Sequence, residues 1–88
     1  MLCNINSTCI RKLNTQLLLV SDSLNLLQEQ MENVLKETGE TWKDQKFEMF
    51  LKEVAPCQQQ IGELSKKYKN LSSQIQPLVE LIEKFEKK

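Results

Sequence analysis

The spacing of the apolar residues constrains the fold of this sequence more than any other feature. It alternates between three and four positions in two series, one before and one after residue 40. Since steps of three and four both return to the same side of an α-helix, each series predicts one helix with one apolar stripe. The first series comprises Ile10, Leu13, Leu17, Val20, Leu24, Leu27, Met31 and Val34. The second comprises Phe47, Phe50, Val54, Cys57, Ile61, Leu64, Tyr68, Leu71, Ile75, Leu78, Ile82 and Phe85.

The segment between the two series carries the signals of a chain reversal. Gly39 can end the first helix in a left-handed conformation, and Thr41 can cap the next one. Asp44, three residues after Thr41, can complete a pair that resembles a capping box. Because so short a connection turns the chain back on itself, the sequence predicts an all-α fold, an antiparallel two-helix hairpin. We expect the two apolar stripes to pack against each other along one seam inside this hairpin. The single expected domain, residues 1–88, divides into a helix over about 7–37, a turn over about 38–42 and a helix over about 43–86.

Two prolines, Pro56 and Pro77, lie inside the second series. Each removes a backbone hydrogen bond and costs about 3 kcal/mol in the interior of a helix. The apolar spacing nevertheless continues through both without a skip. We therefore expect one long helix with kinks at the prolines in preference to separate helices, although Ser72 and Ser73 offer an alternative cap before Pro77.

The expected helix lengths predict self-association. A first helix of roughly 30 residues would span about 45 Å and a second of roughly 43 residues about 65 Å. The segment after about residue 75 would then have little opposite it, and the first helix carries leucines outside its stripe. Dimerisation into a four-helix bundle would cover these side chains. The proposed interface consists of Leu18, Leu19, Leu26, Ile75, Leu78, Leu81, Ile82 and Phe85.

Composition excludes several kinds of chemistry. The 12 basic and 12 acidic residues cancel, so no overall charge attracts nucleic acid or anionic lipid. Histidine, the commonest general base and metal ligand, does not occur in the sequence. The glutamates fall outside the apolar series, where we expect them to be solvated rather than catalytic. The sequence thus predicts no catalytic residue, no cofactor and no metal.

The three cysteines, Cys3, Cys9 and Cys57, form no Cys-x-x-Cys pair. Three thiols without a histidine leave a tetrahedral zinc site one ligand short. We expect reduced thiols, with an intermolecular disulfide through Cys3 or Cys9 as the alternative. Cys57 occupies a position of the apolar series and is expected to be a small buried side chain rather than a nucleophile.

No segment of the sequence reads as a membrane span or a signal peptide. The longest apolar run, Leu17 to Val20, is far shorter than the roughly 20 residues that a spanning helix needs. The N-terminal stretch is interrupted by polar side chains and lacks a signal-peptide core. We therefore expect a protein that is cytoplasmic at synthesis and that, if secreted, leaves the cell without a cleavable signal peptide.

The segment from Trp42 to Phe50 resembles the WXG family of small bacterial proteins associated with type VII secretion. That family has a Trp-x-Gly motif at the turn of a helical hairpin and an aromatic residue eight positions after the tryptophan. Trp42 and Phe50 match in kind and spacing, while Asp44 gives Trp-x-Asp in place of Trp-x-Gly. The resemblance implies a non-catalytic hairpin that forms a homo- or heterodimeric four-helix bundle. It also implies an exported substrate or a chaperone-like partner of a toxin or of the secretion machinery.

Trp42 is the only tryptophan and lies where the two helix ends meet. A ring of this size can close the end of the seam formed by Val34, Leu35 and Phe47, and the alternative is recognition of a partner by its exposed edge. The turn motif that we single out comprises Gly39, Thr41, Trp42, Asp44 and Phe50.

Three hypotheses for function follow. The first is a helical module for protein–protein interaction, which dimerises with itself or a related hairpin and belongs to a specialised secretion system. The second is an intracellular coiled-coil adaptor or structural subunit unrelated to secretion. The third and remotest is a small DNA-associated regulator that would use two basic groups: Lys66, Lys67 and Lys69, and Lys84, Lys87 and Lys88. Because acids are interleaved with or follow these lysines, we expect no nucleic-acid partner.

Two substitutions distinguish the seam from the outer surface. We expect Leu24→Asp to unfold the hairpin, at a cost of several kcal/mol, because it places a charge in the middle of the first stripe. Leu19→Asp should weaken association and leave most of the helicity intact. Circular dichroism and light scattering measure the two effects, and identical behaviour of both variants would contradict a model with two separate faces.

Overall fold

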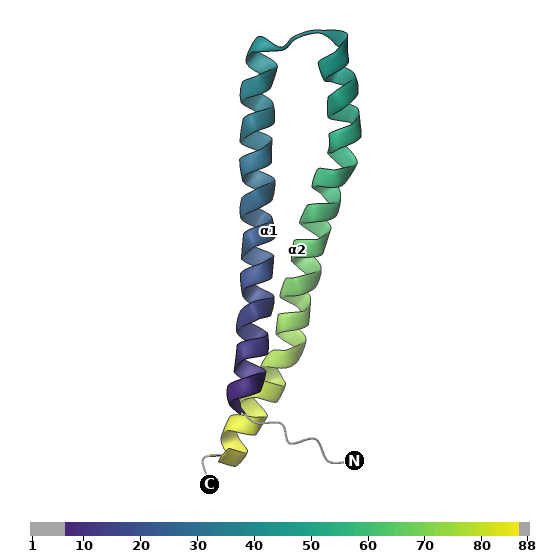
Figure 1. Ribbon diagram of the computed structural model, residues 1–88. Coiled ribbons are helices and arrows are strands. Elements are labelled where there is room, and N and C mark those ends of the chain that lie inside the picture. Colours follow the sequence, from purple (N-terminus) through teal and green to yellow (C-terminus); the bar gives the residue numbers. More distant parts are fainter. Residues whose placement is uncertain (1–6, 87–88) are drawn as a thin grey trace.

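A computed structural model describes residues 7–86 and contains two helices joined by a short turn. Helix α1 spans Ser7–Thr41 and helix α2 spans Gln45–Glu86. The two helices run antiparallel beside each other and form a rod with extents of 66 × 23 × 15 Å (Figure 1). The all-α helical hairpin expected from the sequence is therefore confirmed.

The end of α1 differs from the expectation. The helix continues through Gly39 to Thr41, and the Trp42 amide still donates to the Thr38 carbonyl oxygen at 2.8 Å. No residue in the described range 7–86 has a positive φ, so the left-handed cap expected at Gly39 is wrong. Gly39 serves packing instead, because a Cβ atom there would lie 3.1 Å from Cε2 of Phe47. A side chain at position 39 would require the Phe47 ring to shift by a few tenths of an ångström, so glycine favours the close approach of this ring to α1.

Asp44, rather than Thr41, caps α2. The amide of Phe47 donates to Oδ1 of Asp44 at 3.1 Å, which is the bond from the third residue of a helix to its N-cap. The Thr41 hydroxyl donates to the Thr38 carbonyl oxygen at 3.3 Å and takes no part in α2. The carboxylate also places negative charge at the positive end of the helix dipole. The turn thus reduces to residues 42–44, and α2 begins at Gln45.

Helix α2 continues without interruption through Pro56 and Pro77, as the apolar spacing predicts. Each proline leaves the carbonyl of the residue four positions earlier without its helical partner. These residues are Lys52 and Ser73, and both are exposed, so water can reach the two carbonyl groups. The alternative of separate helices, with a new start near Ser72, is wrong.

The seam between α1 and α2 does not coincide with the predicted apolar stripes. Each stripe consists of two sets of residues spaced seven apart, and only one set of each helix enters the seam. The seam sets, half-buried except for buried Phe47 and exposed Met31, are Ile10, Leu17, Leu24 and Met31 on α1 and Phe47, Val54, Ile61, Tyr68, Ile75 and Ile82 on α2. The expectation that both sets pack inside the hairpin is wrong.

The other half of the seam is largely polar. It consists of a further set in each helix: Ser7, Asn14, Ser21, Gln28 and Leu35 on α1, and Leu51, Gln58, Ser65, Ser72, Val79 and Glu86 on α2. Four of the six buried residues in the described chain are serines from this set, and small side chains allow the two backbones to approach closely. The second apolar set of each stripe, whose place in the seam this polar set takes, lies outside the seam.

The polar residues of the seam form reciprocal layers across the two helices. Ser21 Oγ donates to the Ser65 carbonyl oxygen and Ser65 Oγ to the Ser21 carbonyl oxygen, both at 2.9 Å. Gln28 and Gln58 likewise donate to each other's carbonyl oxygens, at 2.9 and 3.0 Å. Gly62 makes room for this second layer, because a Cβ atom there would lie 2.8 Å from Nε2 of Gln28. Among the described residues no buried side-chain nitrogen or oxygen lacks a hydrogen-bond partner.

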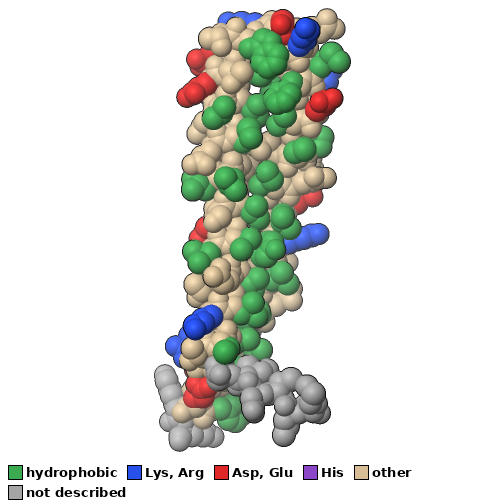
Figure 2. Space-filling view, in the orientation of Figure 1, with side chains coloured by type: hydrophobic (Ala, Val, Ile, Leu, Met, Phe, Trp, Pro, Cys, Tyr) green, Lys and Arg blue, Asp and Glu red, His purple; other side chains and the backbone are tan. Residues whose placement is uncertain are grey.

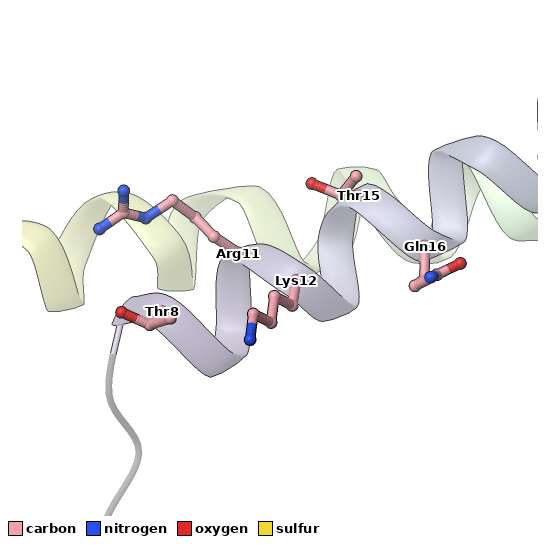
Figure 3. Close-up of a pocket in the computed structure, with 5 residues that line it drawn as sticks. All are labelled: Thr8, Arg11, Lys12, Thr15 and Gln16. Atoms are coloured by element: carbon pink, nitrogen blue, oxygen red, sulfur yellow. The ribbon is translucent and has the colours of Figure 1, made fainter.

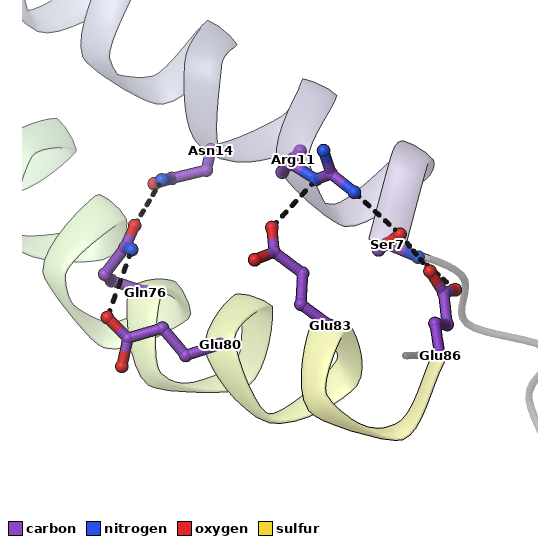
Figure 4. Close-up of polar contacts among 7 residues, drawn as sticks. All are labelled: Ser7, Arg11, Asn14, Gln76, Glu80, Glu83 and Glu86. Carbon is purple, nitrogen blue, oxygen red and sulfur yellow. Dashed lines mark hydrogen bonds and ion pairs between the residues drawn. The ribbon is translucent and has the colours of Figure 1, made fainter. Parts of the chain in front are cut away.

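The end of α2 is held against the start of α1, contrary to the expected unpaired overhang. The Glu86 carboxylate accepts hydrogen bonds from the Ser7 amide, at 2.9 Å, and from the Ser7 hydroxyl (Figure 4). Nε of Arg11 lies 3.0 Å from the Glu83 carboxylate, and Val79 is 4% exposed. The overhang shrinks because α1 has 35 residues rather than about 30, which places its first turn beside the last turns of α2.

The contact between Ser7 and Glu86 predicts a pH dependence. The hydrogen bonds from the Ser7 hydroxyl and amide, with the charge of Arg11, hold the pKa of Glu86 below its ordinary value of 4.5. A carboxyl with a lowered pKa in the folded state stabilises that state above pH 4.5, and this stabilisation is lost as the pH falls through the folded-state pKa. Thermal unfolding should show Glu86→Gln less stable than the native chain at pH 7, with the difference vanishing in acid. A difference that did not shrink as the pH fell below 4.5 would contradict this account.

Candidate partner-binding face

The residues excluded from the seam form one continuous apolar surface, which we call the open face. It consists of Leu13, Val20, Leu27 and Val34 on α1 and Phe50, Cys57, Leu64, Leu71, Leu78 and Phe85 on α2. All are exposed except Val20, which is half-buried. Figure 2 shows hydrophobic side chains over both helices from the turn to the far end of the rod.

Helix geometry explains why both sets lie on the same side of the hairpin. In each helix the open-face set lies three residues after the apolar seam set, on the opposite flank from the polar seam set. In both helices the same rotation about the helix axis leads from the apolar seam set to the open-face set. Because α1 and α2 run antiparallel and face each other, this rotation brings the two open-face sets to the same side of the rod. The apolar stripes therefore converge in front of the hairpin, as the stripes of two neighbouring helices do in a four-helix bundle.

The size of the open face exceeds what an isolated soluble domain normally exposes. Its large side chains are between 37% and 66% exposed, which amounts to an apolar area on the order of 800 Å². The largest apolar patch of a typical monomer is roughly 300–600 Å². An area of about 800 Å² is what each partner of a standard protein–protein interface contributes.

The charged side chains avoid the open face. None of its ten positions is charged, although Glu37 on α1 and Glu53 and Lys67 on α2 lie among the residues that flank it. The opposite side of the rod carries the charges Asp22, Glu29, Lys36, Lys52, Lys66 and Glu80. Two identical faces without charge can approach each other without like-charge repulsion.

Three aromatic rings form a cluster at the turn end of the open face. The Trp42 ring lies 5.0 Å from the Phe47 ring and 6.3 Å from the Phe50 ring, measured between centroids. Phe47 is buried in the seam, while Trp42 and Phe50 are 39% and 45% exposed. Trp42 therefore covers the end of the seam with one part of its ring and presents another part to the surface that Phe50 shares.

The interface residues expected from the sequence do not all lie together. Ile75 and Ile82 are half-buried in the seam, whereas Leu78 and Phe85 lie on the open face. Leu81 flanks that face. The remaining three, Leu18, Leu19 and Leu26, are exposed on α1 outside the open face, so Leu19→Asp is not expected to weaken association through that face. Sequence reasoning missed the open face as a surface because it assigned both apolar sets to the seam.

Both cysteines in the described range 7–86 are exposed. Cys57 is exposed on the open face rather than buried, since its set lies outside the seam. Its sulfur lies 3.8 Å from the Glu53 carbonyl oxygen, within the same helix. Cys9 is exposed near the start of α1, and Cys3 lies outside the described residues. No group of three or more potential metal ligands occurs in residues 7–86.

A shallow hollow near the start of α1 is lined by Thr8, Arg11, Lys12, Thr15 and Gln16 (Figure 3). All five residues come from one helix, and all are exposed. Arg11, one of its two cations, is paired with Glu83 and donates to the Ser7 hydroxyl (Figure 4). The hollow therefore lacks the enclosed, convergent polar groups that hold a small molecule.

Neither described helix is long and apolar enough to cross a membrane. Comparison with protein-family models, with curated proteins and with solved structures gives no match for this chain.

Proposed function

We propose that this protein is a non-enzymatic helical interaction module whose open face packs against the open face of a second copy. The observation that carries this proposal is the position of the open-face half of each apolar stripe: the two halves lie together on one side of the hairpin and not in the seam. In this arrangement the stripes of four helices share one core, and the polar layers of each seam lie on its outer side.

A second copy is the partner that best fits the surface. Self-pairing of two faces of about 800 Å² buries roughly 1,600 Å², the standard size of a specific interface. The absence of charged residues from the open face removes the repulsion that self-pairing would otherwise meet. A related hairpin with a similar apolar face is the alternative partner.

The resemblance of the turn to the WXG family supports a finer version of this proposal, in which the module serves a secretion system. The residues that support it are Trp42, at the turn, and Phe50, beside it on the open face. The module would be a secreted substrate, or a partner or chaperone of a secreted toxin. An intracellular adaptor is the alternative. Detection of the chain in culture supernatant without cell lysis favours secretion, and strict retention in cells favours the adaptor.

Self-association through the open face can be tested with two variants of α2, one with a new charge on the open face and one with the same charge on the opposite side. Leu64→Glu puts a carboxylate in the middle of the open face and should raise the dissociation constant of the dimer at least about 100-fold, because the charge would be buried without a partner. Ser73→Glu adds the same charge on the opposite, exposed side and should leave association unchanged. Analytical ultracentrifugation at about 50 µM protein, where a micromolar dimer is well populated, gives the mass of each species.

Two results would contradict the proposal. The first is a native chain that sediments as a monomer at this concentration. The second is equal association of the Leu64→Glu and Ser73→Glu variants, which would place the interface elsewhere on the rod.

A further inference from the structure

The seam of the hairpin buries few apolar side chains completely, and most of its apolar residues are half-buried. In the described chain the only buried hydrophobic side chains are Phe47 and Val79, which are 6% and 4% exposed. They lie at opposite ends of the rod, Phe47 at the turn and Val79 beside the start of α1. Between them the buried residues are Ser21, Ser65 and Ser72. Along its middle an isolated hairpin thus has no layer of fully buried hydrophobic side chains, only half-buried ones beside the buried serines.

The polar layers define how α1 and α2 pair but add little net stability. Their hydrogen bonds replace bonds that the same groups make to water in the unfolded chain. Their geometry is nevertheless specific, since Ser21 pairs reciprocally with Ser65, and Gln28 with Gln58. Arg11 and Glu83 form the only ion pair between described residues, and it lies at the surface, where such pairs contribute little.

The open face is a large continuous apolar surface that the hairpin leaves uncovered and that could stabilise the fold further. Long amphipathic helices in water depend on packing of their apolar side, and here one half of each stripe, Val20 excepted, stays exposed in the hairpin. We infer that folding is coupled to assembly: the free chain is largely unfolded, and the hairpin becomes stable when a second copy covers the open face. This inference rests on the proposed function and adds that the concentration of the chain controls its folding.

Dilution of the native chain tests the coupling directly. Because the folded state is bound to a second copy, the helical signal at 222 nm should fall by more than half between about 100 µM and about 1 µM, in parallel with loss of the dimer by sedimentation. A dimer that dissociates on dilution into a monomer with undiminished helical signal would overturn the inference and leave the proposed function standing. A native chain that is monomeric and helical at about 100 µM would overturn both. If the native chain is monomeric and non-helical at about 100 µM, the claim that a second copy is the partner would be wrong, while the dependence of folding on a partner would stand.

Variants of the seam distinguish loss of folding caused by blocked assembly from a direct effect of the Leu64→Glu substitution on the fold. The Leu64→Glu variant, which blocks assembly, should lose more than half of its helical signal even when concentrated. Adding Gln28→Leu and Gln58→Leu to it replaces one polar layer by apolar contact and should restore most of that signal in a monomer. The matched control adds Gln28→Leu and Gln59→Leu to the Leu64→Glu variant. It places the second leucine at exposed position 59 instead of half-buried position 58, so it should restore little of the helical signal. A Leu64→Glu monomer that is fully helical, or equal rescue by both pairs, would overturn the inference.

Discussion

The close pairing of α1 and α2 through small and amide side chains determines the rest of this structure. Ser21 and Ser65 are almost completely buried, and Gly62 leaves space for the Gln28 side chain. Because these residues occupy half of the seam, the two helices meet along a line displaced from the centre of each apolar stripe. Every other feature of the surface follows from this displacement, including the exposure of Leu27, a member of the first stripe.

The sequence predicted the type and number of elements but not the direction in which their apolar stripes point. The alternation of three and four residues depends only on the geometry of a single helix, so it predicted α1 and an unbroken α2 through Pro56 and Pro77. It contains no information on whether a stripe faces one neighbour or several. A signal for the true seam was present in the serine, asparagine and glutamine residues that recur every seventh position beside both stripes, namely Asn14, Ser21, Gln28, Gln58, Ser65 and Ser72.

The turn shows a different limit of sequence reasoning. Gly39 and Thr41 are residues that often end and cap helices, yet here helical hydrogen bonding continues past both. The contact that overrides the local preference is tertiary, because Phe47 packs where a side chain at position 39 would lie. Asp44 was identified as a residue of the second helix start, and its role as the cap depends on where α1 stops, which local sequence does not determine.

The polar layers also restrict how the length of such a hairpin can change. The layers centred on Asn14 with Ser72, Ser21 with Ser65 and Gln28 with Gln58 recur at intervals of seven residues along both helices. Deleting one residue from either helix would rotate everything beyond it by about 100° and turn the following layers out of the seam. Only a gain or loss of seven residues in both helices preserves every pairing. Length variation among descendants of this chain should therefore occur in paired heptads, with isolated insertions confined to residues 42–44 and the two ends.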